Sequence, residues 1–330
     1  MRNKVRGIFL FLLLLTFTVL TACSEDAASG ESNKGDGGKS SLDYPTKPIK
    51  IINPFSAGGS ADNTSRILGQ HAQEYLGQSV VIENRDGGGG TIGQTAGAKA
   101  KNDGYTLTLM TSSLVGNVLY SNVGFEVDDF EPIIMVVNDP VYLVVGKDAP
   151  YDTVEEFVAY AKENPGDINV GVNGTQTIPA IANRQLANVA DIEVSTIPFD
   201  GESLALAAVA GGHVDAMYGG YSGFESQLNS GNVKVLAILA DERAEALPDV
   251  PTAKESGVEV SSGSWRGIGA PKGTDPEIID FLHEAFKQTV ENQEYIDQME
   301  KVGIDIFYGG PDEFRDLIKE TTKIYEEYGN

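Results

Sequence analysis

The chain alternates short β-branched runs with amphipathic stretches, and this alternation limits its possible folds more than any other feature. The β-like runs lie at 49–53, 79–83, 105–110, 168–172, 193–197, 214–218 and 233–239. Parallel strands need long crossover connections, which are usually helices. The pattern therefore predicts an α/β protein with mainly parallel sheets that helices cover on both faces.

Helix start signals mark several of the segments between these runs. Thr153 and Glu156 form a capping box ahead of an apolar helix face. The tetrapeptide at 274–277 is a second start signal, with a proline near the first helical position. Apolar and aromatic residues keep helical spacing from 314 to 328. These signals predict helices that begin near 154 and 276 and a long helix at the end of the chain.

Two segments are candidates to carry the chain between two lobes, at 139–145 and at 261–267. If both cross, the first lobe comprises 44–141 plus 264–330, and 142–263 form an inserted second lobe. Two lobes that are hinged at two crossover strands close around a ligand by rigid-body motion.

The first residues predict export. Basic residues at positions 2, 4 and 6 precede an apolar stretch from 8 to 20. This stretch is shorter than the roughly 20 residues that span a bilayer, so residues 1–22 are expected to be a signal peptide. The sequence Leu-Thr-Ala-Cys at 20–23 resembles a lipoprotein signal, in which Cys23 becomes the lipidated N-terminus. A chance cysteine after a plain signal peptide is the alternative.

Cys23 is the only cysteine of the chain, which excludes an internal disulfide framework and a cysteine-cluster metal site. Residues 23–43 are rich in Ser, Gly, Asp and Glu, a composition typical of a flexible tether. A lipid, a tether and a folded body together predict an extracytoplasmic receptor that is anchored to the cell membrane.

The mature chain is strongly acidic. Without the three basic residues at positions 2, 4 and 6, the 24 Lys and Arg become 21 against 48 Asp and Glu, a formal charge of −27. Nucleic acid and anionic lipid headgroups are therefore poor partners. The acidity serves solubility and does not require a cationic ligand, because a site can be locally positive on a negative protein.

Two strand-to-helix loops are candidate anion cradles. The first, at 54–62, contains Gly58 and Gly59, where the backbone can approach a ligand closely. The second, at 173–179, precedes a helix predicted at 180–188. The N-terminus of a helix offers free N–H groups and the positive end of its dipole. Two such loops from different lobes can grip an anion across a cleft without any cationic side chain.

For Asp62 and for the loop at 83–90, a structural role is expected in preference to contact with a ligand. Asp62 lies in the first turn of the first helix, where it is expected to hold loop amides in preference to ligand. The glycine-rich loop at 83–90 is expected to be a turn that leads into a helix at 91–100. None of these loops has the spacing of a dinucleotide-binding motif or a P-loop.

Several loose motifs occur in a characteristic order over nearly the whole chain after the tether. Together they resemble the TctC/Bug family, the extracytoplasmic solute receptors of tripartite tricarboxylate transporters. The motifs are PI (48–49), PFSAGG (54–59), DN (62–63), ENRDGGGG (83–90), DGYTL (103–107), GT (174–175), GHVD (212–215), LPDVPT (247–252), WRG (265–267) and APKGT (270–274).

The resemblance implies a two-lobed, periplasmic-binding-protein-like (Venus flytrap) fold and a small carboxylate ligand, without a cofactor. It implies delivery of that ligand to two integral membrane transporter subunits. It also implies that the two loops pinch one carboxylate, partly through water. At 178–179 the sequence Ile-Pro departs from the family's commoner histidine. The residues implied to form the first jaw are Phe55, Ser60 and Ala61, and those implied to form the second are Gly174, Thr175 and Thr177.

Other residues are candidates for the cleft wall. Asp215 either touches ligand or anchors a strand end, and Trp265 either lines the cleft or packs at the hinge. Arg266 either pairs bidentately with a distal carboxylate or points into solvent. The complete set of predicted ligand-binding residues is Phe55, Gly59, Ser60, Ala61, Asp62, Ser112, Ser113, Gly174, Thr175, Thr177, Phe199, Asp215, Trp265 and Arg266.

An enzyme is not expected. The three histidines, His71, His213 and His283, lack a neighbouring nucleophile motif and metal-ligand spacing, so neither catalytic residues nor a metal site are predicted. Two receptor alternatives stay open. The protein could report to a signalling partner instead of a transporter. It could also bind a neutral or amino-containing solute, with Asp200 or Asp215 pairing an ammonium group.

Overall fold

The computed structural model describes residues 43–328, which belong to one compact unit, Leu42–Asn330. The predicted signal peptide (1–22), Cys23 and the tether up to residue 42 lie outside these residues. Within 43–328, no helix has the length and apolar character needed to cross a membrane.

Strands and helices alternate along this part of the chain, as the hydrophobic pattern predicts. The strands are β1 (Ile49–Asn53), β2 (Val80–Asn84), β3 (Thr106–Thr111), β4 (Phe130–Gly146), β5 (Asn169–Val172), β6 (Ser195–Pro198), β7 (Ala216–Gly219), β8 (Val233–Leu239), β9 (Gly263–Pro271) and β10 (Ile306–Gly309). The α-helices are α1 (Ser60–Leu76), α2 (Thr91–Ala98), α3 (Ser113–Tyr120), α4 (Val154–Glu163), α5 (Ile178–Ala190), α6 (Glu202–Ala210), α7 (Tyr221–Asn229), α8 (Pro276–Glu291), α9 (Gln293–Lys301) and α10 (Pro311–Tyr328).

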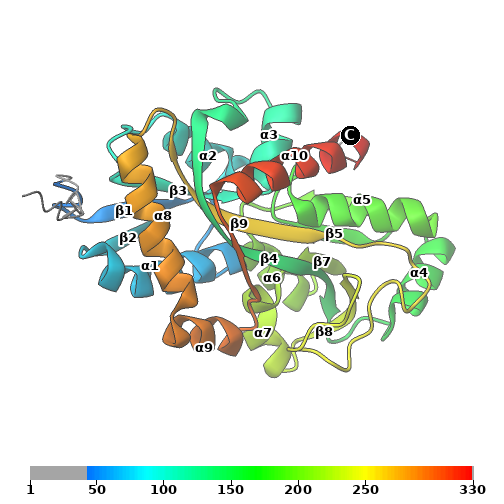
Figure 1. Cartoon of the computed structure of the whole chain (residues 1–330). Helices are drawn as coiled ribbons and strands as arrows, with labels where there is room; N and C mark the ends of the chain where they lie inside the picture. Colours follow the sequence, from blue (N-terminus) through cyan, green and yellow to red (C-terminus); the bar gives the residue numbers. More distant parts are fainter. Residues whose placement is uncertain (1–42, 329–330) are drawn as a thin grey trace, which may run out of the picture. The chain divides into compact units, whose positions relative to one another are not determined.

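Two sheets share the long strand β4, which runs beside β9 through the middle of the structure (Figure 1). We call β1, β2, β3, β9, β10 and the first part of β4 the first sheet. The second sheet contains β5 to β8 and the last part of β4. From Phe130 to Pro140, β4 pairs with β9, and from Val141 to Gly146 it pairs with β8. The chain thus passes from one sheet to the other between Pro140 and Val141, within the candidate crossover at 139–145.

The sheets are mixed and not mainly parallel as predicted. In the first sheet β1 pairs in parallel with β2 and β3, and in the second β5 pairs in parallel with β6 and β7. However, β4 and β9 run antiparallel to each other and to their other neighbours. Strand β4 leaves the first sheet and β9 returns to it, so the two strands run in opposite directions. The predicted limits of the two lobes, 44–141 plus 264–330 and 142–263, stay a prediction.

Two predicted helix starts are confirmed, although the Glu156 side chain accepts from the Asp152 amide and so does not complete the predicted capping box with Thr153. Thr153 accepts a hydrogen bond from the amide of Glu156 at 3.2 Å at the start of α4. Asp275 accepts one from the amide of Glu277 at 2.9 Å at the start of α8. Each cap satisfies an N–H group that has no partner within its helix.

The C-terminal helix α10 fastens segments of both sheets. The Trp265 indole on β9 donates to the Thr321 hydroxyl at 2.8 Å, and its ring packs edge-on against Phe314. The buried Tyr325 hydroxyl donates to the carbonyl of Gln176, next to the start of α5, at 3.0 Å. The Tyr120 hydroxyl on α3 donates to the Tyr325 carbonyl at 2.7 Å. These contacts hold α3, β9 and α5 to one helix.

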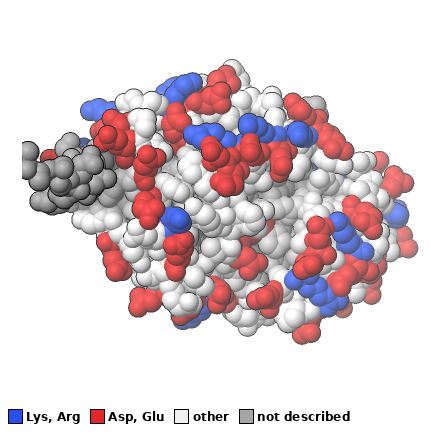
Figure 2. Space-filling model, in the orientation of Figure 1, with Lys and Arg blue, Asp and Glu red and all other residues white. Residues whose placement is uncertain are grey.

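Acidic side chains are spread over the visible face of the molecule, with basic ones among them (Figure 2). This distribution agrees with the excess of 48 Asp and Glu over 24 Lys and Arg. Several of the basic groups form exposed ion pairs, such as Lys319 with Asp316. Such pairs contribute little to stability.

Candidate ligand-binding cavity

A cavity lies where the strand-to-helix loops of both sheets meet. The loops that follow β1 and β3 line it from the first sheet, and those that follow β5, β6 and β7 line it from the second. In open α/β sheets, ligands bind beyond the carboxyl ends of parallel strands. The geometry of these loops therefore makes this cavity the candidate binding site.

Eight of the fourteen predicted residues line this cavity, from both predicted jaws. They are Phe55, Gly59, Ser60, Ala61, Ser112, Ser113, Thr177 and Arg266. Further lining residues that the sequence did not single out as ligand contacts are Ser56, Thr111, Pro140, Val141, Asn173, Ile178, Pro179, Glu202, Gly219, Gly220 and Ser264.

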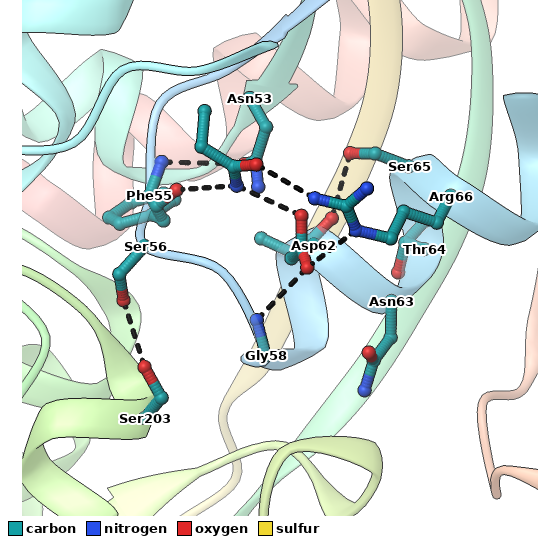
Figure 3. A network of polar contacts seen from close by, with 12 residues as sticks. Asn53, Phe55, Ser56, Gly58, Asp62, Asn63, Thr64, Ser65, Arg66 and Ser203 are labelled. Carbon is teal, nitrogen blue, oxygen red and sulfur yellow. Dashed lines mark hydrogen bonds and ion pairs between the residues drawn. The ribbon is translucent and has the colours of Figure 1, made fainter. Parts of the chain in front are cut away.

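Asp62 holds the first loop and does not line the cavity. One of its carboxylate oxygens accepts hydrogen bonds from the Gly58 amide at 2.9 Å and from Arg66 at 2.8 Å (Figure 3). The other accepts from the side-chain amide of Asn84 at 2.9 Å. Burial alone would raise the pKa of Asp62, but the bonds from Arg66, Gly58 and Asn84 lower it below its ordinary value. The loop-holding role predicted for Asp62 is the one that its contacts support.

A protein carboxylate already occupies the N-terminus of α1. The amide and the hydroxyl of Ser60 both donate to Oε2 of Glu202, at 2.8 and 2.6 Å. The amide of Gly220 donates to Oε1 at 2.6 Å. Glu202 is only 6% exposed and begins α6 of the second sheet. The helix end that was predicted to grip a ligand carboxylate therefore binds Glu202, which joins the two sheets.

Glycines make room for the Glu202 side chain. A Cβ atom on Gly219 would lie 2.2 Å from Oε1, and one on Gly223 would lie 2.4 Å from the carboxylate carbon. A Cβ on Gly59 would lie 3.2 Å from that of Glu202. The first two distances are shorter than real Cβ contacts. A larger residue at the end of β7 or in the first turn of α7 would therefore collide with the Glu202 carboxylate.

The signal that could have revealed Glu202 is its position. The strand predicted at 193–197 runs into Gly201-Glu202 at the start of a helix, the same strand, glycine and helix arrangement as in the two predicted cradles. Its partners Ser60 and Gly220 are distant in sequence, so the pattern along the chain gives no sign of their contact.

Arg266 is buried in an ion pair and does not point into solvent, which rejects the solvated alternative. Its Nη1 donates to Asp139 at 2.6 Å and to the Thr64 hydroxyl at 3.3 Å. Both side chains of the pair are at most 5% exposed. Burial raises the pKa of Asp139 to about 6, although the guanidinium of Arg266 acts to lower it. Because Arg266 also lines the cavity, a charged but already paired group faces it.

The second loop contributes the start of α5. The Thr177 hydroxyl donates to the Gly174 carbonyl at 3.0 Å and accepts from the Ala180 amide at 3.4 Å, which caps the helix. From the first sheet, Ser112 precedes α3, and its side chain does not cap that helix. The starts of α3 and α5 thus meet at the cavity from the two sheets.

The other predicted residues lie elsewhere. Gly174, Thr175 and Phe199 line a separate surface depression with Gly88 and Gly89. A Cβ on Gly174 would lie only 2.6 Å from the Gly89 Cα, so the glycine-rich loop at 83–90 lies directly against the second loop.

Asp215 and Trp265 have structural contacts. Asp215 accepts from the Asn169 amide at 2.8 Å, at the start of β5. Trp265 is 2% exposed and packs under α10. These contacts match the strand-anchor and hinge-packing alternatives for the two residues.

The histidines take no part in the cavity. His71 bonds the side chain of Gln298 at 2.7 Å, and His283 bonds the Ile133 carbonyl at 2.8 Å. Across the part of the chain that the structure describes, no cluster of three or more His, Cys, Asp or Glu is placed to hold a metal ion.

Comparison with known proteins identifies the fold and the kind of protein. Residues 64–327 match the family model described as "Tripartite tricarboxylate transporter family receptor". Protein BugT of Bordetella pertussis is 33% identical over 282 residues, which are 84% of this chain and 86% of BugT. This family consists of periplasmic solute-binding receptors, which is not a class of enzymes.

Two solved structures are similar over most of the chain. MatC from Rhodopseudomonas palustris with bound malate has a TM-score of 0.82 at 28% identity, covering 87% of this chain and 100% of MatC. An R. palustris protein with adipate has a TM-score of 0.84 at 26% identity, covering 87% of this chain and 97% of that protein. The predicted periplasmic-binding-protein fold is confirmed.

Proposed function

Because this chain belongs to the receptor family of tripartite tricarboxylate transporters, we propose that it captures a small carboxylate solute in the cavity and delivers it to a membrane transporter of that type. The similar structures with malate and adipate support a carboxylate as the ligand class. The partners would be two integral membrane subunits, as the family resemblance implies.

One observation carries the proposal, namely that the starts of α3 and α5 reach the same cavity from the two sheets. The first-turn amides of a helix and its dipole favour an anion. At α5 the dipole and the Ile178 amide would serve this purpose, because Pro179 has no N–H and the Ala180 amide bonds the Thr177 hydroxyl. The neighbouring hydroxyls of Ser112, Ser113 and Thr177 add hydrogen-bonding groups to the same wall. A carboxylate held between these helix starts would keep the two sheets together, which couples binding to closure.

We also propose that the receptor acts outside the cytoplasm and is anchored through a lipid on Cys23. The basic and apolar start of the chain, the residues at 20–23 and the polar tether support this localisation. A tethered receptor stays close to its transporter, which raises the effective concentration of the receptor at the transporter.

A thermal-shift screen tests the carboxylate proposal. Protein produced from the full-length gene is heated with di- and tricarboxylates and, as controls, with neutral sugars. We expect at least one carboxylate to raise the unfolding midpoint, because a ligand that binds only the folded state stabilises it. A clear shift with a sugar and none with any carboxylate, aminated or not, would reject the proposed ligand class.

A further inference from the structure

The cavity contains an anion that belongs to the protein. Of its lining residues in the described part of the chain, only Glu202 and Arg266 carry a side chain that is charged at neutral pH. Glu202 is buried, and its oxygens are fixed by Ser60 and Gly220. A ligand that enters this cavity therefore meets a fixed carboxylate.

Arg266 does not neutralise Glu202. Its guanidinium lies 2.6 Å from the carboxylate of Asp139, and both groups are buried. The three groups Glu202, Arg266 and Asp139 thus carry a net charge of about −1 when all are ionised. Like charges within a few ångströms repel strongly in a buried site. A ligand with carboxylates at both ends would have to place one of them near this negative charge.

Glu202 can still accept another hydrogen bond. A carboxylate has about four lone-pair positions, and the bonds from Ser60 and Gly220 use three of them. Asn173, which directly follows the adjacent strand β5, lines the same cavity. Its Oδ1 is buried and has no hydrogen-bond partner within residues 43–328. Two of the lining residues therefore have unused acceptor capacity.

We propose that the ligand is a carboxylate that also carries a protonated amine, and that Glu202 binds the amine. An ammonium group supplies three N–H donors and one positive charge, which match the two acceptors and the excess negative charge. The carboxylate of the ligand lies at the starts of α3 and α5, away from Glu202. This inference rests on the proposed carboxylate-binding function and narrows it to amino-carboxylates.

Matched pairs of acids isolate the contribution of the amine. Isothermal titration calorimetry compares succinate with aspartate and adipate with 2-aminoadipate, and malate adds a neutral hydroxyl at the same carbon. We expect the aminated member of the pair that fits the cavity to bind at least about tenfold tighter, as is typical for a hydrogen bond to a charged group. Malate should lie between succinate and aspartate.

Two variants assign the preference to Glu202. Glu202→Gln keeps the size of the side chain and removes its charge, so the preference for the amine should fall at least about tenfold. Glu163→Gln removes a charge from the exposed face of α4 and should change neither affinity.

The outcomes separate the two proposals. Equal or tighter binding of the unaminated acids by the unmodified protein overturns the amine inference but leaves the carboxylate proposal standing. A preference for the amine that survives in Glu202→Gln would mean that Glu202 only joins the two sheets, which also overturns it. Binding of neutral sugars and of no acid, aminated or not, overturns both proposals. If Glu202→Gln does not fold, the comparison of acids with the unmodified protein still decides.

Discussion

At the scale of single residues, buried charge is the feature that most distinguishes this cavity. Arg266 and Asp139 bury a complete ion pair, while Glu202 is buried against neutral donors. Burying such groups is costly unless each finds a partner. Buried ionisable groups with a perturbed pKa, such as Asp139, tend to gather at functional sites.

The Arg266–Asp139 pair leads to a prediction about pH. The pKa of Asp139 is raised from 3.8 to about 6 by burial, so the folded protein binds this proton more tightly than the unfolded chain does. Its contribution to stability is complete below about pH 4 and is lost as the pH rises through 6. The free energy of unfolding of the unmodified protein, minus that of Asp139→Asn, should therefore decrease between pH 4 and 7. Urea unfolding at several pH values measures it.

Asp316 is the control for this prediction, because its pKa is shifted in the opposite direction. The exposed Asp316 bonds Lys319, which lowers its pKa, so its small contribution is lost as the pH falls. For Asp316→Asn the same difference should stay level or increase with pH. If the free energy of unfolding of the unmodified protein minus that of Asp139→Asn increased with pH, the pair with Arg266, and not burial, would determine the pKa of Asp139.

Residues that line the cavity could be predicted from the sequence where they lie in a recognisable strand-to-helix loop. Phe55, Ser60 and Thr177 could be located because each lies in a strand-to-helix loop that the pattern marks. Glu202 was missed because its role depends on Ser60 and Gly220, which the fold brings together from both sheets. Arg266 was recognised, but its partner Asp139 could not be identified before the pairing of β4 with β9 was known.

At the scale of elements, two helix caps offer a matched test of the role of α5. Thr177→Ala and Thr153→Ala each remove a capping hydroxyl, and each should lower the free energy of unfolding by about 1 kcal/mol. Only Thr177 lines the cavity. We therefore expect Thr177→Ala also to weaken binding of the ligand severalfold, while Thr153→Ala leaves the affinity unchanged. Equal affinities in the two variants, measured by calorimetry, would exclude the start of α5 from the site.

The length of strand β4 explains why the sequence pattern did not reveal it. Strands usually have five or six residues, and the predicted strands fit this length. Strand β4 runs from Phe130 to Gly146 and includes Pro140, a residue that usually interrupts strands. Here Pro140 pairs with Gly263 at the point where the chain leaves the first sheet. A strand that belongs to two sheets has no signature in local periodicity, so only the candidate crossover at 139–145 was recognised in this region.

At the scale of the whole molecule, the receptor depends on segments that lie at opposite ends of the sequence. Helix α10 contacts β9, α3 and the loop before α5 through Thr321 and Tyr325. The alternation of strands and helices predicted the α/β class, and the two candidate crossovers and the family resemblance predicted two lobes. It did not predict which loops would meet, because that depends on how the two sheets pack and not on either sheet alone.

The proposed anchor is a further property of the whole molecule. Cys23→Ser removes the only thiol that a lipid could modify. We expect the unmodified protein in the membrane fraction and Cys23→Ser in the soluble extracytoplasmic fraction, because a receptor without lipid has only weak contacts with the bilayer. Immunoblots of the separated fractions measure the distribution. Equal membrane retention of the two proteins would reject lipidation at Cys23.

The pairing of β9 has a consequence for the nascent chain. Thr108 on β3 pairs with Gly269 on β9, and β9 also pairs with the first part of β4. A ribosome therefore completes β1 to β3 long before their last neighbour exists. Until residues 263–271 emerge, β3 presents an open edge, and such edges recruit other strands. One edge of β3 therefore has no partner until the C-terminal part of the chain has been synthesised.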